Sequence, residues 1–389
     1  MLVKRLMAAS VASALAYVGS GAMPFQITAL MRRDGLGASA AGMFGFFEIL
    51  SFALVMMIAS RLLGARWLRS AGLAGALGCL CANLILATVG GDHYAIWTEA
   101  AFLGASQALL GRAYVCTAAA SDNPDRMFLL ASALSTLIIV SLIATIPFFG
   151  TWFGDAGVFL AYCAFIVVLS PCLFMLPRSA GEAAHLEDFV EERRQLRFPV
   201  FGLMAIALGM SLAVGMAWSF SHHFAELIRM SEVKIALIDN IGLLSGVAAL
   251  VAASLAAGRL NTIAVLAVAV VGAGGGAALI CLAQTPSVYA IAVVINWIFA
   301  STACCWIPAA SAELDRTGQA ATLCSSAERI GYAFGAPFGG FILDHASHQF
   351  LAAAAFLCCV TALPFSLPRI ARDVRASAPG RSASTAGAG

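Results

Sequence analysis

The sequence predicts an all-α membrane protein with twelve transmembrane helices. Of its 389 residues, 61% are apolar and only 11% are charged, and the mean hydropathy is +0.92. A soluble domain carries about a quarter charged residues, so this chain has too little polar surface to face water. Apolar tracts of about 20 residues, enough to cross a bilayer core about 30 Å thick as helices, recur along the whole chain. We therefore expect a polytopic membrane protein.

Twelve tracts have the required length. In order, they cover residues 6–30, 38–59, 70–90, 94–119, 127–149, 156–176, 199–222, 235–257, 262–282, 288–310, 322–343 and 350–367. The first tract follows a basic start, as a signal peptide does, but its apolar run continues to residue 30 and similar tracts follow it. We therefore expect it to be retained as the first membrane helix.

Positive charges in the loops indicate an orientation. If both termini face the cytoplasm, about sixteen lysines and arginines lie on the inner side, and four remain on the outer side. Those four are Arg32, Arg33, Arg229 and Lys234. Basic loop residues favour the cytoplasmic side, so we expect an even number of spans with both termini inside.

A polar segment divides the chain into two parts of similar length. Residues 178–198, RSAGEAAHLEDFVEERRQLRF, carry mixed charges that suit a short amphipathic helix on the cytoplasmic face. We expect an N-terminal six-helix bundle over residues 1–177 and a C-terminal one over residues 199–370. Residues 371–389 are small and polar, which predicts a disordered cytoplasmic tail.

The two parts resemble each other. ASRLLGARWLR follows the second tract and AASLAAGRLN follows the eighth, and both combine small residues with glycine and arginine. A repeated six-helix unit is typical of secondary transporters, which bind substrate between the repeats near the middle of the membrane.

This pattern of six and six spans with a charged central loop resembles the major facilitator superfamily over residues 6–367. The first basic loop keeps Ser60, Arg61, Gly64 and Arg66 of the motif usual there, although its aspartate is absent. SDNPDRMF also resembles a loop of several bacterial members, and GYAFGAPFGG is similar to a glycine-proline motif of drug antiporters. Close helix packing also explains the second of these, since small residues let helices approach.

The resemblance implies two pseudo-symmetric six-helix bundles that rock about a central cavity in a bacterial inner membrane, and a functional monomer. The expected partners are a small-molecule substrate, protons and membrane lipid.

Glu48 is the deepest ionisable residue, in the middle of GMFGFFEILSFALVMM. It lies twelve residues from Ser60, which is roughly 18 Å along a helix. An acid at that depth costs on the order of 3 kcal/mol. A buried carboxyl group is neutral when dry and ionises when water enters, as proton coupling requires. The alternative is a neutral acid that only hydrogen-bonds a neighbouring helix.

Asp239 holds nearly the matching place in the eighth tract, which makes it the second proton-coupling candidate. It could instead be only a residue near the start of a helix.

Four charged residues lie toward the inner ends of the fourth, tenth and eleventh tracts, and we expect them to form an inner gate. They are Arg112, Glu313, Glu328 and Arg329. Our hypothesis is that Arg112 pairs with Glu328 or Glu313; an arginine that holds an anionic substrate is the alternative.

His222 and His223 end the seventh tract, one turn before Glu226. Histidine titrates near physiological pH, so an outer gate that responds to pH is one hypothesis and an interfacial histidine pair is the other. A metal site would need more converging ligands than the sequence offers.

Five polar or aromatic residues within the tracts are candidates to bind substrate: Gln26, Trp218, Asn240, Asn296 and Trp297. Pro24, in the first tract, could kink its helix around such a site.

These features predict a proton-coupled secondary transporter of a small organic molecule. Deep carboxylates outnumber deep arginines, which favours a neutral or cationic substrate, and the glycine-proline motif favours export of a lipophilic compound. Proton-coupled import of a small metabolite or organic acid is the alternative. A transporter-like membrane sensor that does not transport is the alternative from another class.

Several function classes lack their signatures. The sequence has no P-loop, no nucleophile with an adjacent base, and no basic tract for nucleic acid, so we expect no enzyme, no cofactor and no nucleic-acid partner. The eleven cysteines lie almost wholly in apolar tracts and form no CxxC pair, which predicts small buried hydrophobic side chains.

Overall fold

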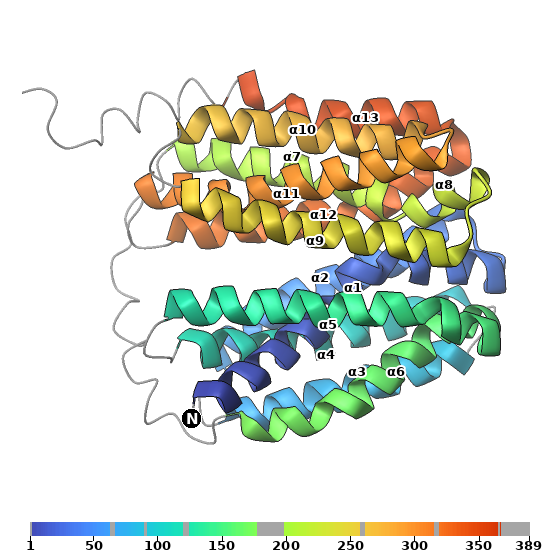
Figure 1. The fold of residues 1–389 in the computed structure, drawn as a ribbon, viewed down its shortest axis with the longest axis vertical. Helices are drawn as coiled ribbons and strands as arrows, with labels where there is room; N and C mark the ends of the chain where they lie inside the picture. Colours follow the sequence, from blue (N-terminus) through green and yellow to red (C-terminus); the bar gives the residue numbers. More distant parts are fainter. Residues whose placement is uncertain are drawn as a thin grey trace, which may run out of the picture.

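The computed structural model describes residues 2–62, 67–88, 92–119, 124–176, 198–256, 261–314, 319–364 and 366. Within these ranges the regular structure is helical, and the long helices run side by side along one common direction (Figure 1). The predicted linker helix and the predicted tail lie outside the described residues, except that Phe198 begins a helix.

The earlier part of the chain forms six α-helices and two short 3-10 helices among the described residues. They are α1 (Leu2–Asp34), α2 (Ala38–Leu62), α3 (Leu68–Thr88), α4 (His93–Ala119), α5 (Pro124–Phe153), η2 (Gly154–Ala156), α6 (Gly157–Leu169) and η3 (Ser170–Met175). Helix α1 packs against α4, α5, α2 and α6.

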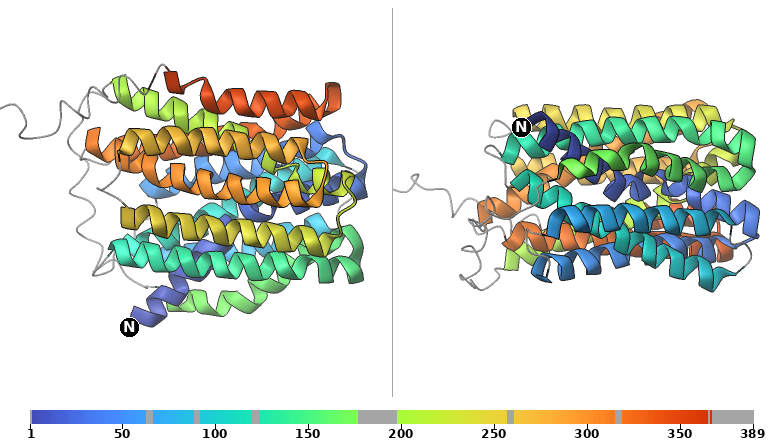
Figure 2. Two further views of the ribbon diagram at one scale, coloured as in Figure 1. Left: turned by 45° about the horizontal axis from the view of Figure 1, so that its top comes forward. Right: turned by 90° about the horizontal axis from the view of Figure 1, so that it is seen from below.

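The later part of the chain forms seven helices among the described residues. They are α7 (Phe198–Trp218), α8 (Ser221–Leu227), α9 (Glu232–Ala256), α10 (Thr262–Leu282), α11 (Pro286–Leu314), α12 (Gln319–His345) and α13 (His348–Val360). Helix α10 packs against α11 and α13, and α9 packs against α11. The views of Figure 2 show the later helices gathered beside the earlier ones.

Eight segments of the described chain are long and apolar enough to cross a membrane, so the chain is a multi-pass membrane protein. This number is smaller than the twelve predicted tracts for two visible reasons. One apolar segment, Leu130–Met175, contains most of α5 together with η2, α6 and η3. Helices α4 and α12 are long but more polar, and α13 is short.

The seventh tract departs from its predicted bounds. Helix α7 ends at Trp218, and a separate short helix, α8, begins at Ser221. His222 and His223 therefore lie on α8 rather than at the end of a long helix.

Helix α12 packs closely against α7 and also against α2, which belongs to the earlier part of the chain. The glycines of GYAFGAPFGG make both approaches possible. A Cβ atom on Gly335 would lie 2.7 Å from the Cα of Gly215 and 2.7 Å from the carbonyl oxygen of Leu212. One on Gly340 would meet the backbone of Ala38. Close packing thus accounts for this motif.

Gly335→Ala should destabilise the protein by about 1–3 kcal/mol, because the added methyl group has no room between α12 and α7. Gly275→Ala in α10 is the matched control, since a Cβ atom there meets nothing within 4 Å. Both changes raise helix propensity, so only the packing differs. Thermal unfolding of the detergent-solubilised variants measures the effect. A Gly335 variant as stable as the Gly275 variant would contradict the close contact.

Candidate functional site

Glu48 lies in the interior of the helices, with 1% of its surface exposed. Its Oε1 accepts a hydrogen bond from Nε2 of Gln107 in α4 at 2.9 Å, and its Oε2 has no partner among the described residues. Two glycines make room for it. A Cβ atom on Gly19 of α1 would meet the Glu48 carboxyl group, and one on Gly104 of α4 would meet the Glu48 carbonyl oxygen.

Asp239 is fully buried in α9. Its Oδ1 accepts a hydrogen bond from the Tyr289 hydroxyl of α11 at 3.4 Å, and its Oδ2 has no partner in the described part of the chain. Within that part, neither Asp239 nor Glu48 has a cationic side chain at salt-bridge distance. Each of the two buried acids is therefore held by one uncharged donor.

The sequence analysis did not identify those donors. Gln107 and Tyr289 are among the few polar side chains within their tracts, which is the signal that could have marked them. The sequence does not show which helix each donor faces, because each contact joins two different helices and so depends on how the helices pack.

The five predicted substrate residues are buried or half-buried. The rings of Trp218 and Trp297 meet edge to face with centroids 5.1 Å apart. Gln26 is fully buried, and neither atom of its amide has a partner in the described chain. The same holds for Oδ1 of Asn240, Oδ1 of Asn296 and Nε1 of Trp297.

Buried polar groups are nearly always hydrogen-bonded to protein or water. The four side chains with unpaired buried atoms can therefore accept water or a ligand. The structure brings the two tryptophans together, but no described hydrogen bond joins Gln26 to Asn240 or Asn296.

Arg329 contributes a contact that the inner-gate hypothesis did not include. Its guanidinium carbon lies 4.9 Å from the ring centroid of Tyr17 in α1 and 5.7 Å from that of Phe52 in α2. The two rings are 5.6 Å apart. An arginine over aromatic rings at this distance is a cation–π contact, and here it joins α12 to the earlier helices.

The proposed Arg112–Glu328 pair stays a prediction. The described partner of Glu328 is the Cys304 thiol, which donates to Oε1 at 3.6 Å. The side chain of Glu313 lies outside the described residues.

In the last turn of α1, one arginine contacts three carboxylates. Arg32 of α1 contacts Asp155 of η2 at 3.5 Å and Glu232 of α9 at 2.9 Å, and it also pairs with Glu226 of α8. We call these four residues the Arg32 cluster. The sequence analysis counted Arg32 only as an outer basic residue, because its partners are up to 200 residues away.

His222 adjoins the Arg32 cluster and is buried, with 3% of its surface exposed. Its Nε2 lies 3.5 Å from Glu226, and its ring lies 4.5 Å from that of Phe25. Helix α8 thus turns the His222 side chain inward. Both hypotheses for the histidine pair, an outer gate that responds to pH and an interfacial pair, stay predictions. His223 is half-buried and contacts the ring of Phe224.

A small cavity with mixed polar and apolar walls adjoins this cluster. Arg32, Asp155, His222 and Glu232 line it together with Thr28. Among the described residues, no group of three or more His, Cys, Asp and Glu side chains is placed to hold a metal ion. The ten described cysteines form no disulfide bond with one another.

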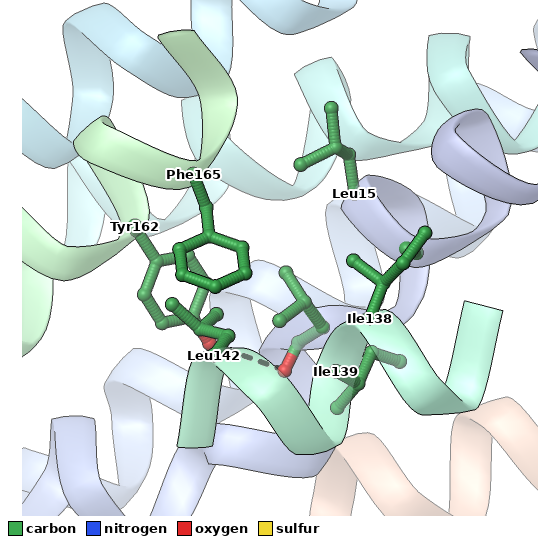
Figure 3. A pocket seen from close by; sticks show the side chains of 8 residues that line it. Leu15, Ile138, Ile139, Leu142, Tyr162 and Phe165 are labelled. Atoms are coloured by element: carbon green, nitrogen blue, oxygen red, sulfur yellow. Dashed lines mark hydrogen bonds between the residues drawn. The ribbon is translucent and has the colours of Figure 1, made fainter. Parts of the chain in front are cut away.

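A second cavity lies between α1, α5 and α6 (Figure 3). Its walls include Leu15, Ile138 and Phe165, and they are apolar apart from Tyr162. The hydroxyl of Tyr162 already donates to the carbonyl oxygen of Val18 at 3.1 Å (Figure 3). This cavity therefore offers no free polar group to a hydrophilic ligand.

One further contact joins α12 to the earlier helices at the end that carries the Arg32 cluster. Asp344 accepts hydrogen bonds from the backbone N–H of Ala38 at 3.0 Å and of Ser39 at 2.8 Å. These N–H groups belong to the first residues of α2. A carboxylate is stabilised there, because the first N–H groups of a helix have no partner within it and the helix dipole is positive at this end.

The arrangement of the helices has known counterparts among solved structures. No protein-family model and no curated protein sequence matches the chain. A crystal structure of the nucleoside transporter NupG matches with a TM-score of 0.67 and 14% identity, covering 96% of this chain and 100% of that one. A point mutant of NupG gives 0.69 at 12% identity, covering 94% and 99%.

A D-xylose-proton symporter matches with a TM-score of 0.65 and 14% identity, covering 94% of this chain and 96% of that one. The chain has the fold of the major facilitator superfamily. At these identities the likeness is one of fold. The comparisons therefore support the arrangement of the helices and do not assign a role to any residue described above.

Arg32→Gln should open the end of the protein at which the Arg32 cluster lies, because it removes ion pairs between the earlier and the later helices. Losing about 1 kcal/mol of closure energy multiplies an open population about fivefold. A cysteine at position 28, in a cysteine-free background, reports this as faster labelling by a maleimide, because Thr28 is buried in the adjoining cavity.

Arg33→Gln is the matched control. The described contacts of Arg33 include Asp34, the Leu86 carbonyl and the ring of Phe159, which all belong to the earlier part of the chain. Equal labelling rates in the two variants would mean that the cluster does not close this end.

Proposed function

We propose that the protein is a proton-coupled secondary transporter that takes up a small, uncharged, hydrogen-bonding metabolite. The observation that carries the proposal is the pair of buried acids, Glu48 and Asp239, each bonded by one neutral donor with its second oxygen unpaired. The fold neighbours, a nucleoside transporter and a D-xylose-proton symporter, support the same class.

The comparisons favour import, the alternative of the sequence analysis, over its main prediction of export. None of the three neighbours is named as an exporter of lipophilic compounds. The glycine-proline motif, which favoured export, is accounted for by the packing of α12. All three neighbours are transporters, which supports a protein without enzymatic activity.

Proton coupling follows from the surroundings of the two acids. A carboxyl group without a cationic partner is neutral in a dry interior, because an isolated charge there is costly. When water reaches it, the same group releases its proton. Glu48 and Asp239 would therefore bind and release protons as the interior opens to one side or the other.

The substrate chemistry follows from the unpaired polar groups. Gln26, Asn240 and Asn296 offer amide groups, and Trp297 offers an indole N–H beside the ring of Trp218. Such groups bind hydroxyl, carbonyl or ring nitrogen atoms without demanding a charge, and the indole faces pack on apolar or ring surfaces. A hydroxylated or heterocyclic metabolite fits this set better than an ion.

The architecture that we propose retains twelve spans in two six-helix bundles, residues 1–177 and 199–370, with a cytoplasmic linker over residues 178–198 and a cytoplasmic tail. Both termini would face the cytoplasm of a bacterial cell, and the monomer would transport. The Arg32 cluster would close the outer side. Arg329, with Arg112 and Glu328, would close the inner side.

Proteoliposomes that contain a pH dye test the function, with nucleosides and aldoses as probes. Glu48→Gln and Asp239→Asn should each lower substrate-driven proton movement roughly tenfold or more, a loss of about 1.4 kcal/mol in the coupled step. Exchange of labelled for unlabelled substrate should persist, because exchange needs no net proton release. Asp92→Asn is the control, since Asp92 is exposed before α4.

Proton movement that is unchanged in both variants would contradict coupling through these acids. A wild-type protein that moves none of the probes would favour the sensor alternative.

A further inference from the structure

The carbonyl group of Ser20 in α1 lacks its partner within the helix for a chemical reason. In an α-helix the carbonyl of each residue accepts from the N–H four residues later. Four residues after Ser20 stands Pro24, inside α1. Proline has no N–H, and its ring pushes against the carbonyl four residues before it. The Ser20 carbonyl is therefore turned out of the helix as a free acceptor.

Two donors from the later part of the chain satisfy this acceptor. The indole Nε1 of Trp218 donates to the Ser20 carbonyl oxygen at 3.2 Å, and the hydroxyl of Tyr332 donates to it at 3.4 Å. The first distance lies within the usual range for N–H···O bonds, and the second is longer and weaker. The donors are 198 and 312 residues away in sequence. We call this the Ser20 junction.

The closest approach of α7 and α12 delivers both donors. Gly335 of α12 lies against Gly215 of α7, where neither helix has a side chain to keep them apart. Trp218 follows Gly215 by three residues, and Tyr332 precedes Gly335 by three. Each of the two side chains therefore lies about one helical turn from the contact of Gly215 with Gly335, and both reach the Ser20 carbonyl of α1.

The Ser20 junction also adjoins two features of the candidate site, the Glu48 carboxyl group and the Trp218–Trp297 pair. Gly19, the preceding residue, faces the Glu48 carboxyl group. On the other side, the indole of Trp218 meets that of Trp297 edge to face. Ser20 and Tyr332 are only half-buried, so this polar group is not sealed in the core.

We propose that Pro24 and Ser20 are positioning residues of the substrate site. Pro24 frees the Ser20 carbonyl, and that carbonyl holds the indole of Trp218, and more weakly the phenol of Tyr332, in the orientation that binds substrate. The proposal rests on the proposed function, in which Trp218 contacts the substrate. Pro24 and the Ser20 carbonyl would thus act on the substrate site through the backbone and not through a polar side chain.

A first test needs no substrate. Pro24→Ala restores an N–H that competes with Trp218 for the Ser20 carbonyl. In protein labelled with 15N-tryptophan, each of the six tryptophans contributes one indole N–H, and the signal that Trp218→Phe removes is that of Trp218. Pro24→Ala should shift this signal toward that of a weaker hydrogen bond. Pro147→Ala, a proline inside α5, should leave it in place. A Trp218 signal that Pro24→Ala does not move overturns the proposal.

The second test measures uptake in proteoliposomes with the probe that the wild-type protein transports. Pro24→Ala and Trp218→Phe should each raise KM roughly fivefold, the value of one uncharged hydrogen bond. Tyr332→Phe should raise it less. The double variant should not exceed the larger single effect, because both changes remove the same bond. Pro147→Ala should leave KM unchanged, and it controls for the effect on stability of replacing a proline inside a helix.

Effects of Pro24→Ala and Trp218→Phe that multiply, or a KM unchanged in Pro24→Ala, would overturn the positioning role while the transport function stands. A wild-type protein that transports no probe would instead overturn the proposed function, and the positioning role with it.

Discussion

The close packing of α12 against α7 and α2 is the contact on which the rest of the structure depends. It places one helix of the later part of the chain against a helix of the earlier part over much of its length. Three contacts across the protein then start from α12: Arg329 over two aromatic rings, Tyr332 to the Ser20 carbonyl, and Asp344 to the start of α2. A helix that kept side chains at its glycine positions would stand too far away to make them.

Lipid gives the polar groups of this protein a second constraint. No water in the bilayer core can satisfy them, so they must turn toward other helices. Glu48 and Asp239 satisfy this constraint with a single neutral donor each, an amide in one case and a phenol in the other. A cationic partner would hold each acid permanently ionised. The neutral donors leave both protonation states accessible, which a proton-coupled carrier requires.

The Arg32 cluster and the contact of Arg329 with two aromatic rings differ in kind. The Arg32 cluster is made of charges that remain partly exposed, with 38% of the Arg32 side chain open to solvent. Ion pairs of this kind are worth little each and exchange readily with water. Arg329 instead lies against the rings of Tyr17 and Phe52. The electrons of these rings attract the guanidinium group, so this contact does not require a carboxylate partner.

Sequence alone determined that this chain is a helical membrane protein, because hydropathy is a sum over neighbouring residues. It also identified Glu48 and Asp239, since an acid within an apolar tract is visible without knowing its neighbours, and it offered small-residue packing as an explanation of GYAFGAPFGG. The tertiary structure decided everything that joins separate helices: the donors to the two acids, the carboxylates around Arg32, the inward turn of His222 and the partners of the Ser20 carbonyl. Those contacts join residues tens to hundreds of positions apart, and they depend on which face each helix presents to its neighbours. Such information lies in the packing of side chains between helices, and a pattern along one helix does not contain it.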